Sequence, residues 1–271
     1  MRIFKSFLVL SIFLQLLTVE KSVLAEENPF RKEIADSGIH GDPCAQAPRD
    51  PKLWNKSVAF GLSYTDGNSE TTVLNLNTKI DRDYKQDIWK FELDANYGES
   101  ASDVDEDREK NKEDIKATGS YKYLFNKKTF AAIGANYLYD DIADIDYRAI
   151  VTPGLGYFLL KSEEFKLSVE AGPAYVFEKV GGEKNNYLAP RIADGFDWQI
   201  NETSKFFQTA EVLFDAEDSE DTIVNATVGI ASAINSSLSL VFSIKDNFDN
   251  QPAKGSERND VAIVTALQVS L

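Results

Sequence analysis

The chain has 271 residues and carries 44 acidic against 29 basic side chains, which gives a formal net charge of -15 at pH 7. Phosphate backbones repel such an acidic chain, so the composition excludes a protein that binds nucleic acid by neutralising phosphates. A single cysteine, Cys44, excludes an internal disulfide bond.

The first 25 residues are predicted to be a secretory signal peptide. Arg2 and Lys5 precede an apolar run at 7–14, and the small side chain of Ala25 precedes a cleavage point that leaves Glu26 as the first mature residue. The run is shorter than the about 20 residues of a membrane-spanning helix. No second run of this kind follows, so a helical membrane protein is excluded.

Residues 26–52 are predicted to be a periplasmic N-terminal extension with little structure of its own. The stretch is charged, rich in Pro and Asp, and lacks hydrophobic periodicity. It contains the only histidine, His40, and the only cysteine, Cys44. Two such ligands are fewer than a structural zinc site needs, so we predict no metal site.

A different pattern occupies residues 53–271. Val58, Phe60 and Leu62 alternate with small or polar residues, which is the period-two pattern of a β-strand with one apolar face. The alternation recurs in the segments 54–64, 72–80, 89–97, 115–123, 131–139, 149–157, 165–175, 192–200, 206–214, 224–230, 238–244 and 261–271. We therefore predict an all-β fold, an antiparallel transmembrane β-barrel of about twelve strands in an up-and-down meander.

The links between these segments alternate in length. Tight links follow every second segment, and the intervening links are longer and polar, with 66–70 as a short exception. The tight links are 82–86, 125–128, 161–164, 201–204 and 235–237, and the longer ones include 98–112, 179–186 and 248–259. Short periplasmic turns and longer outer loops are typical of bacterial outer-membrane barrels. We therefore predict a location in the bacterial cell outer membrane, with both termini in the periplasm.

Features at the strand ends agree with a barrel in a membrane. Aromatic side chains gather near both ends of the predicted strands, as in interfacial girdles, although aromatic residues also favour strands in general. The last segment is apolar at alternate positions up to Leu271 and resembles the C-terminal strand that the outer-membrane assembly machinery recognises, with Leu in place of the usual Phe. Asp194 falls on the predicted lipid-facing side, so we expect a bulge or shifted register near the outer end of its strand.

The stretch from Gly61 to Ser69, together with Trp54, resembles the salt-induced outer-membrane protein family, a family of uncharacterised outer-membrane β-barrel domains. The resemblance covers residues 54–271, and its most local feature is a Gly-Asn turn of a kind that favours hairpins in any β protein. It implies an outer-membrane barrel of about twelve strands and a link by name to salt stress. It transfers no catalytic or binding residues.

The sequence offers little for catalysis. Barrel phospholipases, lipid A deacylases, palmitoyl transferases and omptin-like proteases rely on a histidine at the barrel, whereas His40 precedes the first predicted strand. No cofactor motif occurs, and Gly181 and Gly182 are expected only to permit a turn. We therefore predict no catalytic residues, no cofactor and no enzymatic activity, which disfavours a lipid hydrolase.

Polar residues on the inward-facing parity are the main candidate functional feature. The pore-lining candidates are Lys79, Asp81, Glu92, Asp94, Lys116, Lys122, Arg148, Glu170, Arg191, Asp197 and Glu211. The same inward set also contains Asn75, Asn77, Lys90, Asn96, Lys166, Asp215 and Lys245. Such charges need partners out of bulk water, so they could cross-link a filled lumen, or they could line a narrow passage, since wide channels belong to barrels of about 16 to 18 strands.

Two acidic segments, 102–114 and 215–221, lie in predicted outer loops. Neither has the spacing of an EF-hand calcium loop. They are expected to be solvated surface loops or to bridge through divalent cations to lipopolysaccharide.

The leading prediction is a non-enzymatic outer-membrane β-barrel that forms a narrow channel for small polar solutes or ions and is linked to envelope or salt stress. The alternative is a structural or adhesive surface barrel that acts through its acidic outer loops. A soluble periplasmic β protein also stays open, because period-two alternation alone does not distinguish lipid from a protein core. The expected partners are outer-membrane lipids and lipopolysaccharide, the assembly machinery, and small ions or solutes.

Overall fold

The computed structural model describes residues 54–66, 71–100, 109–216 and 222–271. The predicted signal peptide, the predicted extension with His40 and Cys44, and parts of both acidic segments lie outside these residues. The described residues contain no helix that is long and apolar enough to cross a membrane.

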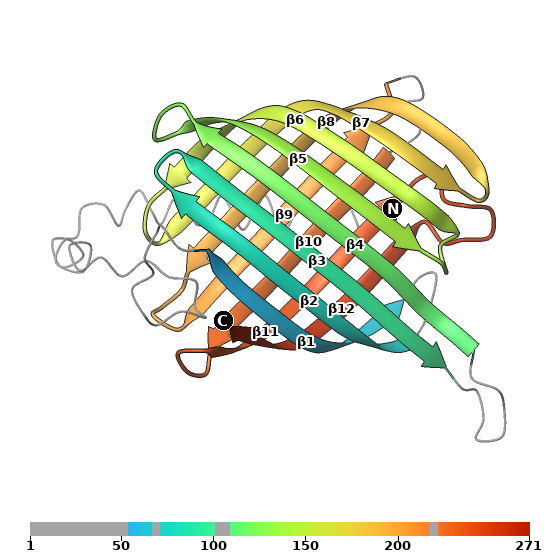
Figure 1. Ribbon diagram of the computed structural model, residues 1–271, viewed down its shortest axis with the longest axis horizontal. Coiled ribbons are helices and arrows are strands. Elements are labelled where there is room, and N and C mark those ends of the chain that lie inside the picture. Colours follow the sequence, from blue (N-terminus) through green and yellow to red (C-terminus); the bar gives the residue numbers. More distant parts are fainter. Residues whose placement is uncertain (1–53, 67–70, 101–108, 217–221) are drawn as a thin grey trace, which may run out of the picture. The chain divides into compact units, whose positions relative to one another are not determined.

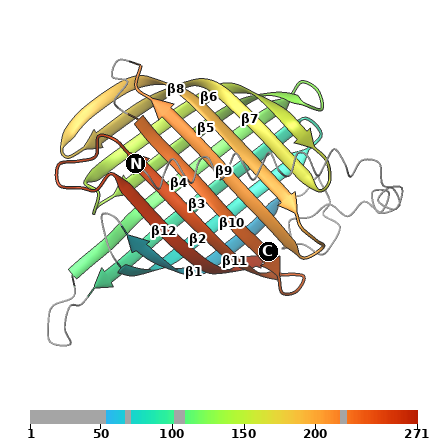
Figure 2. The same cartoon turned by 180° about the vertical axis from the view of Figure 1, so that it is seen from behind.

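Twelve antiparallel strands form a closed barrel in which each strand pairs with its neighbours in sequence and β12 pairs with β1 (Figures 1 and 2). The strands are β1 Asn55–Asp66, β2 Thr71–Tyr84, β3 Asp87–Ser100, β4 Glu109–Leu124, β5 Thr129–Asp140, β6 Ile145–Lys161, β7 Phe165–Val180, β8 Glu183–Gln199, β9 Ser204–Phe214, β10 Thr222–Ala233, β11 Leu238–Asp249 and β12 Asn259–Ser270. The predicted all-β, twelve-stranded up-and-down barrel is confirmed.

Alternation of side chains gives the barrel an apolar outer face. Phe60 of β1 lies opposite Leu76 of β2 and Leu267 of β12, and all three side chains are exposed. The opposite parity faces the lumen: Arg148 of β6 contacts Asp249 of β11, and only the interior of the barrel can bring such distant strands together. A hydrophobic surface and a polar interior are the reverse of a soluble protein and are typical of transmembrane barrels.

The two ends of the barrel differ in how the strands are joined. At one end, called here the turn end, short links join β2 to β3, β4 to β5, β6 to β7, β8 to β9 and β10 to β11. Asn126, Asn201 and Asn235 stabilise three of these links, because each Oδ1 accepts two backbone N–H groups. Strand β1 begins and β12 ends at this same end. The opposite end is called the loop end.

Several predicted long links at the loop end are wrong. Strands β7 and β8 continue to Val180 and Glu183, which leaves only Gly181 and Gly182 as a hairpin turn. Both glycines have positive φ, 59° and 79°, as a type I′ turn requires. The link between β5 and β6 is likewise short, at 141–144. These segments were predicted to be loops because they are polar. Pairing between backbones does not require apolar side chains, so the strands continue through them.

The bulge expected near Asp194 is also wrong. β8 pairs in continuous register with β7 and β9, and Asp194 lies opposite Val169 and Ala210. It keeps the outward parity and sits five residues before Gln199, in the half of β8 nearer the turn end. The register shifts of the barrel occur in other strands, such as between Gly98 and Glu99 of β3.

Candidate functional site

The lumen collects the polar residues singled out in the sequence. Every pore-lining candidate, from Lys79 to Glu211, lies on the inward parity of its strand. Asp215 is the exception within the larger inward set, since β9 ends at Phe214. These side chains are not scattered, because most of them join one of three groups of contacts along the barrel axis.

At the loop end, Lys112 of β4 lies between two carboxylates. Its Nζ is 3.0 Å from Asp114 Oδ1 and 2.8 Å from Asp140 Oδ2, and all three side chains are largely buried. Asn96 of β3 donates a further hydrogen bond of 2.7 Å to Asp114. Asp140 also accepts backbone N–H groups from the turn that follows β5. The cation, the carboxylates and the turn thus hold one another in place.

Arg148 makes the second loop-end contact and spans the lumen. Its Nε donates to Glu178 Oε2 on neighbouring β7 at 2.6 Å, and its Nη2 donates to Asp249 Oδ2 on β11 at 2.7 Å. The Arg148 and Glu178 side chains are each only 9% exposed. A charge-assisted contact across the barrel restricts the passage at this level.

The sequence reasoning missed most residues of the loop-end group. Lys112 was assigned to a loop, and neither Glu178 nor Asp249 was included in any predicted strand face. Glu178 and Asp249 keep the inward parity of β7 and β11, but the alternation of apolar and polar residues fades at Lys179 and Asp246. Extending the inward and outward alternation of each strand past its predicted end would have placed Glu178 and Asp249 on the inner face.

In the middle of the lumen, a chain of charges connects four strands. Lys122 of β4 pairs with Glu170 of β7, Glu170 also contacts Arg191 of β8 at 3.5 Å, and Arg191 pairs with Glu211 of β9. Asn225 of β10 donates to Glu211 at 3.4 Å. Opposite charges alternate along the chain, so each carboxylate is neutralised without leaving the lumen wall.

A second central group lies on the opposite wall. Lys245 of β11 reaches across to Asp94 of β3 at 3.1 Å. Asn77 of β2 donates to both Asp94 and Glu92, at 2.8 and 2.7 Å, and Lys79 pairs with Glu92 at 3.1 Å. Amide and charged groups therefore cover this wall, which can exchange hydrogen bonds with water or a polar solute.

The turn end of the lumen carries lysines in excess. Lys205 pairs with Asp197 at 2.7 Å. Lys90 and Lys166 make no ion pair and no side-chain hydrogen bond with a partner anywhere in the described ranges. Lys116, closer to the middle, is in the same situation. These cations face the lumen, and no carboxylate of the described residues contacts them.

The inner wall also has two apolar patches, which the sequence reasoning did not anticipate. One covers β6 to β10 toward the loop end and comprises Ile150, Ala174, Val176, Tyr187, Ala189, Leu213 and Ile223. The other is at the turn end, where Leu124, Phe130 and Phe158 are buried and the two phenyl rings lie 4.9 Å apart. The lumen wall is therefore less uniformly polar than the period-two pattern suggested.

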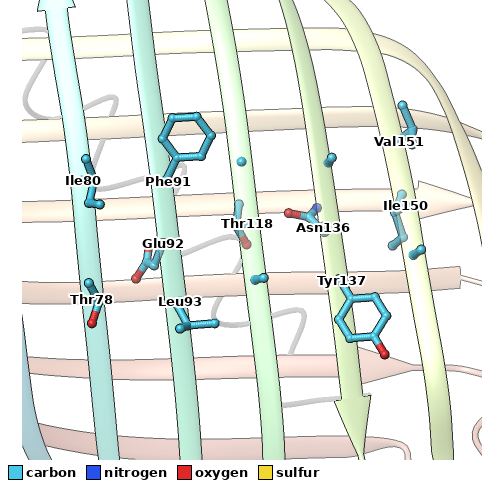
Figure 3. Close-up of a pocket in the computed structure, with 14 residues that line it drawn as sticks. Thr78, Ile80, Phe91, Glu92, Leu93, Thr118, Asn136, Tyr137, Ile150 and Val151 are labelled. Atoms are coloured by element: carbon cyan, nitrogen blue, oxygen red, sulfur yellow. The ribbon is translucent and has the colours of Figure 1, made fainter.

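The outer face contains a hollow of about 590 Å³ that spans β2 to β6 (Figure 3). Its lining includes the small residues Ala117, Gly119 and Ala135 and the larger side chains of Phe91 and Tyr137. Because its outward-facing side chains are mostly apolar, the hollow is a depression in the outer band.

The described ranges contain no group of three or more His, Cys, Asp or Glu that could hold a metal ion. The only histidine of the chain, His40, precedes the barrel strands.

Comparisons with known proteins agree with the barrel. The structure is similar to the NanC porin, with a TM-score of 0.54, 9% identity and coverage of 79% of this chain and 100% of the porin. It is also similar to the KdgM porin in complex with disordered oligogalacturonate (TM-score 0.47, 9% identity, 79% and 99% coverage) and to the outer membrane phospholipase A of Escherichia coli (TM-score 0.47, 8% identity, 84% and 95% coverage). At these identities the likeness shows the fold alone.

A search of curated protein sequences finds no match. A family model described as "Protein of unknown function, DUF481" matches residues 58–271, which is nearly the whole predicted barrel. The family description carries no reference to salt, so the predicted salt-induced name stays a prediction. The chain belongs to the DUF481 family of proteins of unknown function, and its fold is that of the outer-membrane porin barrels.

Proposed function

We propose that this protein is a bacterial outer-membrane channel, which acts without catalysis and gives small polar solutes or ions a narrow passage through its lumen. The observation that carries the proposal is the arrangement of the two faces of a closed barrel. Apolar side chains such as Phe60 and Leu267 face outward, whereas charged and amide groups occur at the loop end, in the middle and at the turn end of the interior.

The width of the lumen favours a selective passage over an open one. Twelve strands enclose less space than the about 16 to 18 strands of wide porins. Arg148 spans the lumen at the loop end, and Phe130 and Phe158 occupy part of the wall at the turn end. The solutes would therefore be small and would exchange their hydration for contacts with the wall.

The proposed orientation places the turn end in the periplasm and the loop end outside. Short turns on the periplasmic side are usual in bacterial barrels. Both ends of the barrel chain, at Asn55 and Ser270, lie at the turn end, which also suits a chain that enters from the periplasm.

The test is the single-channel conductance of refolded residues 26–271 in planar lipid bilayers, with several salts. Discrete and reproducible current steps are expected. The Arg148→Ala variant should raise the conductance, because it removes the contact to Asp249 that spans the lumen. Insertion without current would contradict the channel, and failure to insert would contradict the membrane barrel itself.

A second candidate, a closed structural barrel, is favoured by the same contacts across the lumen. Lys122 with Glu170 and Lys245 with Asp94 each join distant strands and would stiffen a barrel that conducts nothing. Under this function the barrel inserts, carries no current and loses stability when these pairs are removed. The adhesive function depends on acidic segments largely outside the described residues, and the link to salt stress rests on the family resemblance; both stay predictions.

A further inference from the structure

We propose that the turn end of the lumen holds a binding site for small multivalent oxyanions, formed by Lys90 of β3 and Lys166 of β7 with the support of Lys122 and Lys205. The inference rests on the proposed function, because such a site would set which solutes the passage selects.

Within the described residues, the two lysines of this site have no carboxylate within ion-pair distance. Lys90 and Lys166 make no ion pair and no side-chain hydrogen bond with a partner in the described residues. In the strand register Lys90 lies opposite Ser120 of β4, two residues from Lys122, and Lys122 reaches Glu170 on β7, the strand that carries Lys166. Both lysines also act electrostatically on the carboxylate of Asp197 on β8. Lys90 also acts on the ammonium group of Lys122. Their charges therefore share one region of the lumen.

The carboxylates that lie near these two lysines have partners of their own. Asp81 faces Lys90 in the strand register, but its Oδ2 accepts a hydrogen bond of 2.8 Å from Asn55. Asp197 lies opposite Lys166 in the register and pairs with Lys205 at 2.7 Å.

The remaining acids near the site are also engaged. Glu170 is shared between Lys122 and Arg191. Asp83 acts electrostatically on Lys161 at the rim of the turn end. Once these contacts are counted, Lys90 and Lys166 keep positive charge that an incoming anion can neutralise.

The balance of charges at the turn end differs from that at the loop end. There, both Lys112 and Arg148 lie between two carboxylates, so no positive charge is left for a solute. At the turn end, the excess of ammonium groups is confined within low-dielectric walls, which strengthens the attraction for an anion.

The chemistry of the lysines indicates the class of ligand. Each ammonium group has three donors and no acceptor, and its flexible stem lets two lysines from different strands close on one ion. Sulfate and phosphate present several acceptor oxygens and more than one charge, so they can contact both lysines at once. A chloride ion has a single charge and no separate acceptor oxygens, so it is expected to bind the two lysines more weakly.

The experiment is a calorimetric titration of sodium sulfate into the refolded chain in detergent micelles, with sodium chloride as the competing salt. Wild-type protein should bind sulfate, and the K90Q/K166Q variant should bind at least about tenfold more weakly, because two charges close to the anion are lost. The K90R/K166R variant keeps both charges and should bind within about threefold of wild type. The matched control is K127Q/K128Q, which removes two exposed charges from the turn at the same end and should bind as wild type does.

Sulfate binding equal in wild type and K90Q/K166Q would overturn the inference, as would the absence of sulfate binding to wild type, which does not depend on any variant folding. Binding in micelles is independent of passage. Ion conduction without sulfate binding would support the proposed function and contradict this site. Sulfate binding without current would support the site and contradict the proposed function.

Discussion

The two ends of the lumen use their charges differently. At the loop end, Lys112 and Arg148 are each held between two carboxylates and hydrogen-bonded into the wall. At the turn end, Lys90 and Lys166 lack such partners, and apolar rings occupy the neighbouring wall. The comparison suggests that the loop end is a structural closure of the barrel, whereas the turn end keeps groups available for a solute.

The largest expected effect concerns the turn end. Phe130 is fully buried and packs on Phe158, so Phe130→Ala should destabilise the barrel by about 4 kcal/mol through lost burial and the cavity left behind. Urea unfolding in lipid vesicles would measure the loss. The exposed Phe125→Ala serves as the control, and equal losses in both variants would show that the Phe130 ring is not packed.

The next effect breaks the loop end. Arg148→Ala should cost about 3 kcal/mol, because it leaves Glu178 and Asp249 as unpaired charges in a poorly hydrated place. Lys179→Ala removes an exposed ion pair with Asp146 on the adjoining strand and should change the free energy of unfolding little. If both variants unfolded alike, the loop end would not be a structural closure.

A smaller effect compares the two faces of one strand. Ala135→Lys places a charge on the outer face of β5 and should destabilise the barrel by about 2 kcal/mol. Asn136→Lys places the same charge on the next residue, inside the lumen, and should be nearly neutral. Unfolding in vesicles measures both, and the reverse order would invert the assignment of inside and outside.

The smallest effect is at the loop-end rim. A hydrogen bond from Lys110 lowers the pKa of Asp141, an exposed residue in the turn between β5 and β6. A lowered pKa in the folded state means that the contribution to stability is present at neutral pH and is lost as the pH falls through that pKa. Asp141→Asn should therefore lower the melting temperature slightly at neutral pH, by the small amount that the wild-type protein loses in acid, and the two proteins should melt alike at low pH.

The sequence predicted the fold almost completely. Period-two alternation requires one apolar and one polar face, and this pattern located all twelve strands and the inward parity of residues such as Lys122 and Arg191. The predicted strands end too early at the loop end. Glu178 and Glu183 are polar and lie outside the predicted strand segments, although their backbones continue the β7–β8 pairing. The residue types in these segments do not show that backbone pairing continues beyond the part of the strand that spans the bilayer.

The site was predicted only as a set of residues. Which charges meet depends on the closure of the barrel, which brings Lys245 to Asp94 across 151 positions of sequence. No spacing in the sequence encodes such a contact. The inward apolar residues, such as Val176 and Leu213, were missed because the inner parity was assumed to be polar throughout.

The central claim is that water fills the lumen while lipid covers the outer face. The most direct measurement is cysteine scanning of β5 from Ala131 to Tyr139 in a Cys44→Ser background, with a membrane-impermeant thiol reagent applied to the protein in lipid vesicles. Cysteines at positions 132, 134, 136 and 138 are expected to react, and those at the odd-numbered positions between them are not. Protection of both sets would contradict a water-filled lumen, and reaction of the odd-numbered set alone would contradict the assignment of the two faces.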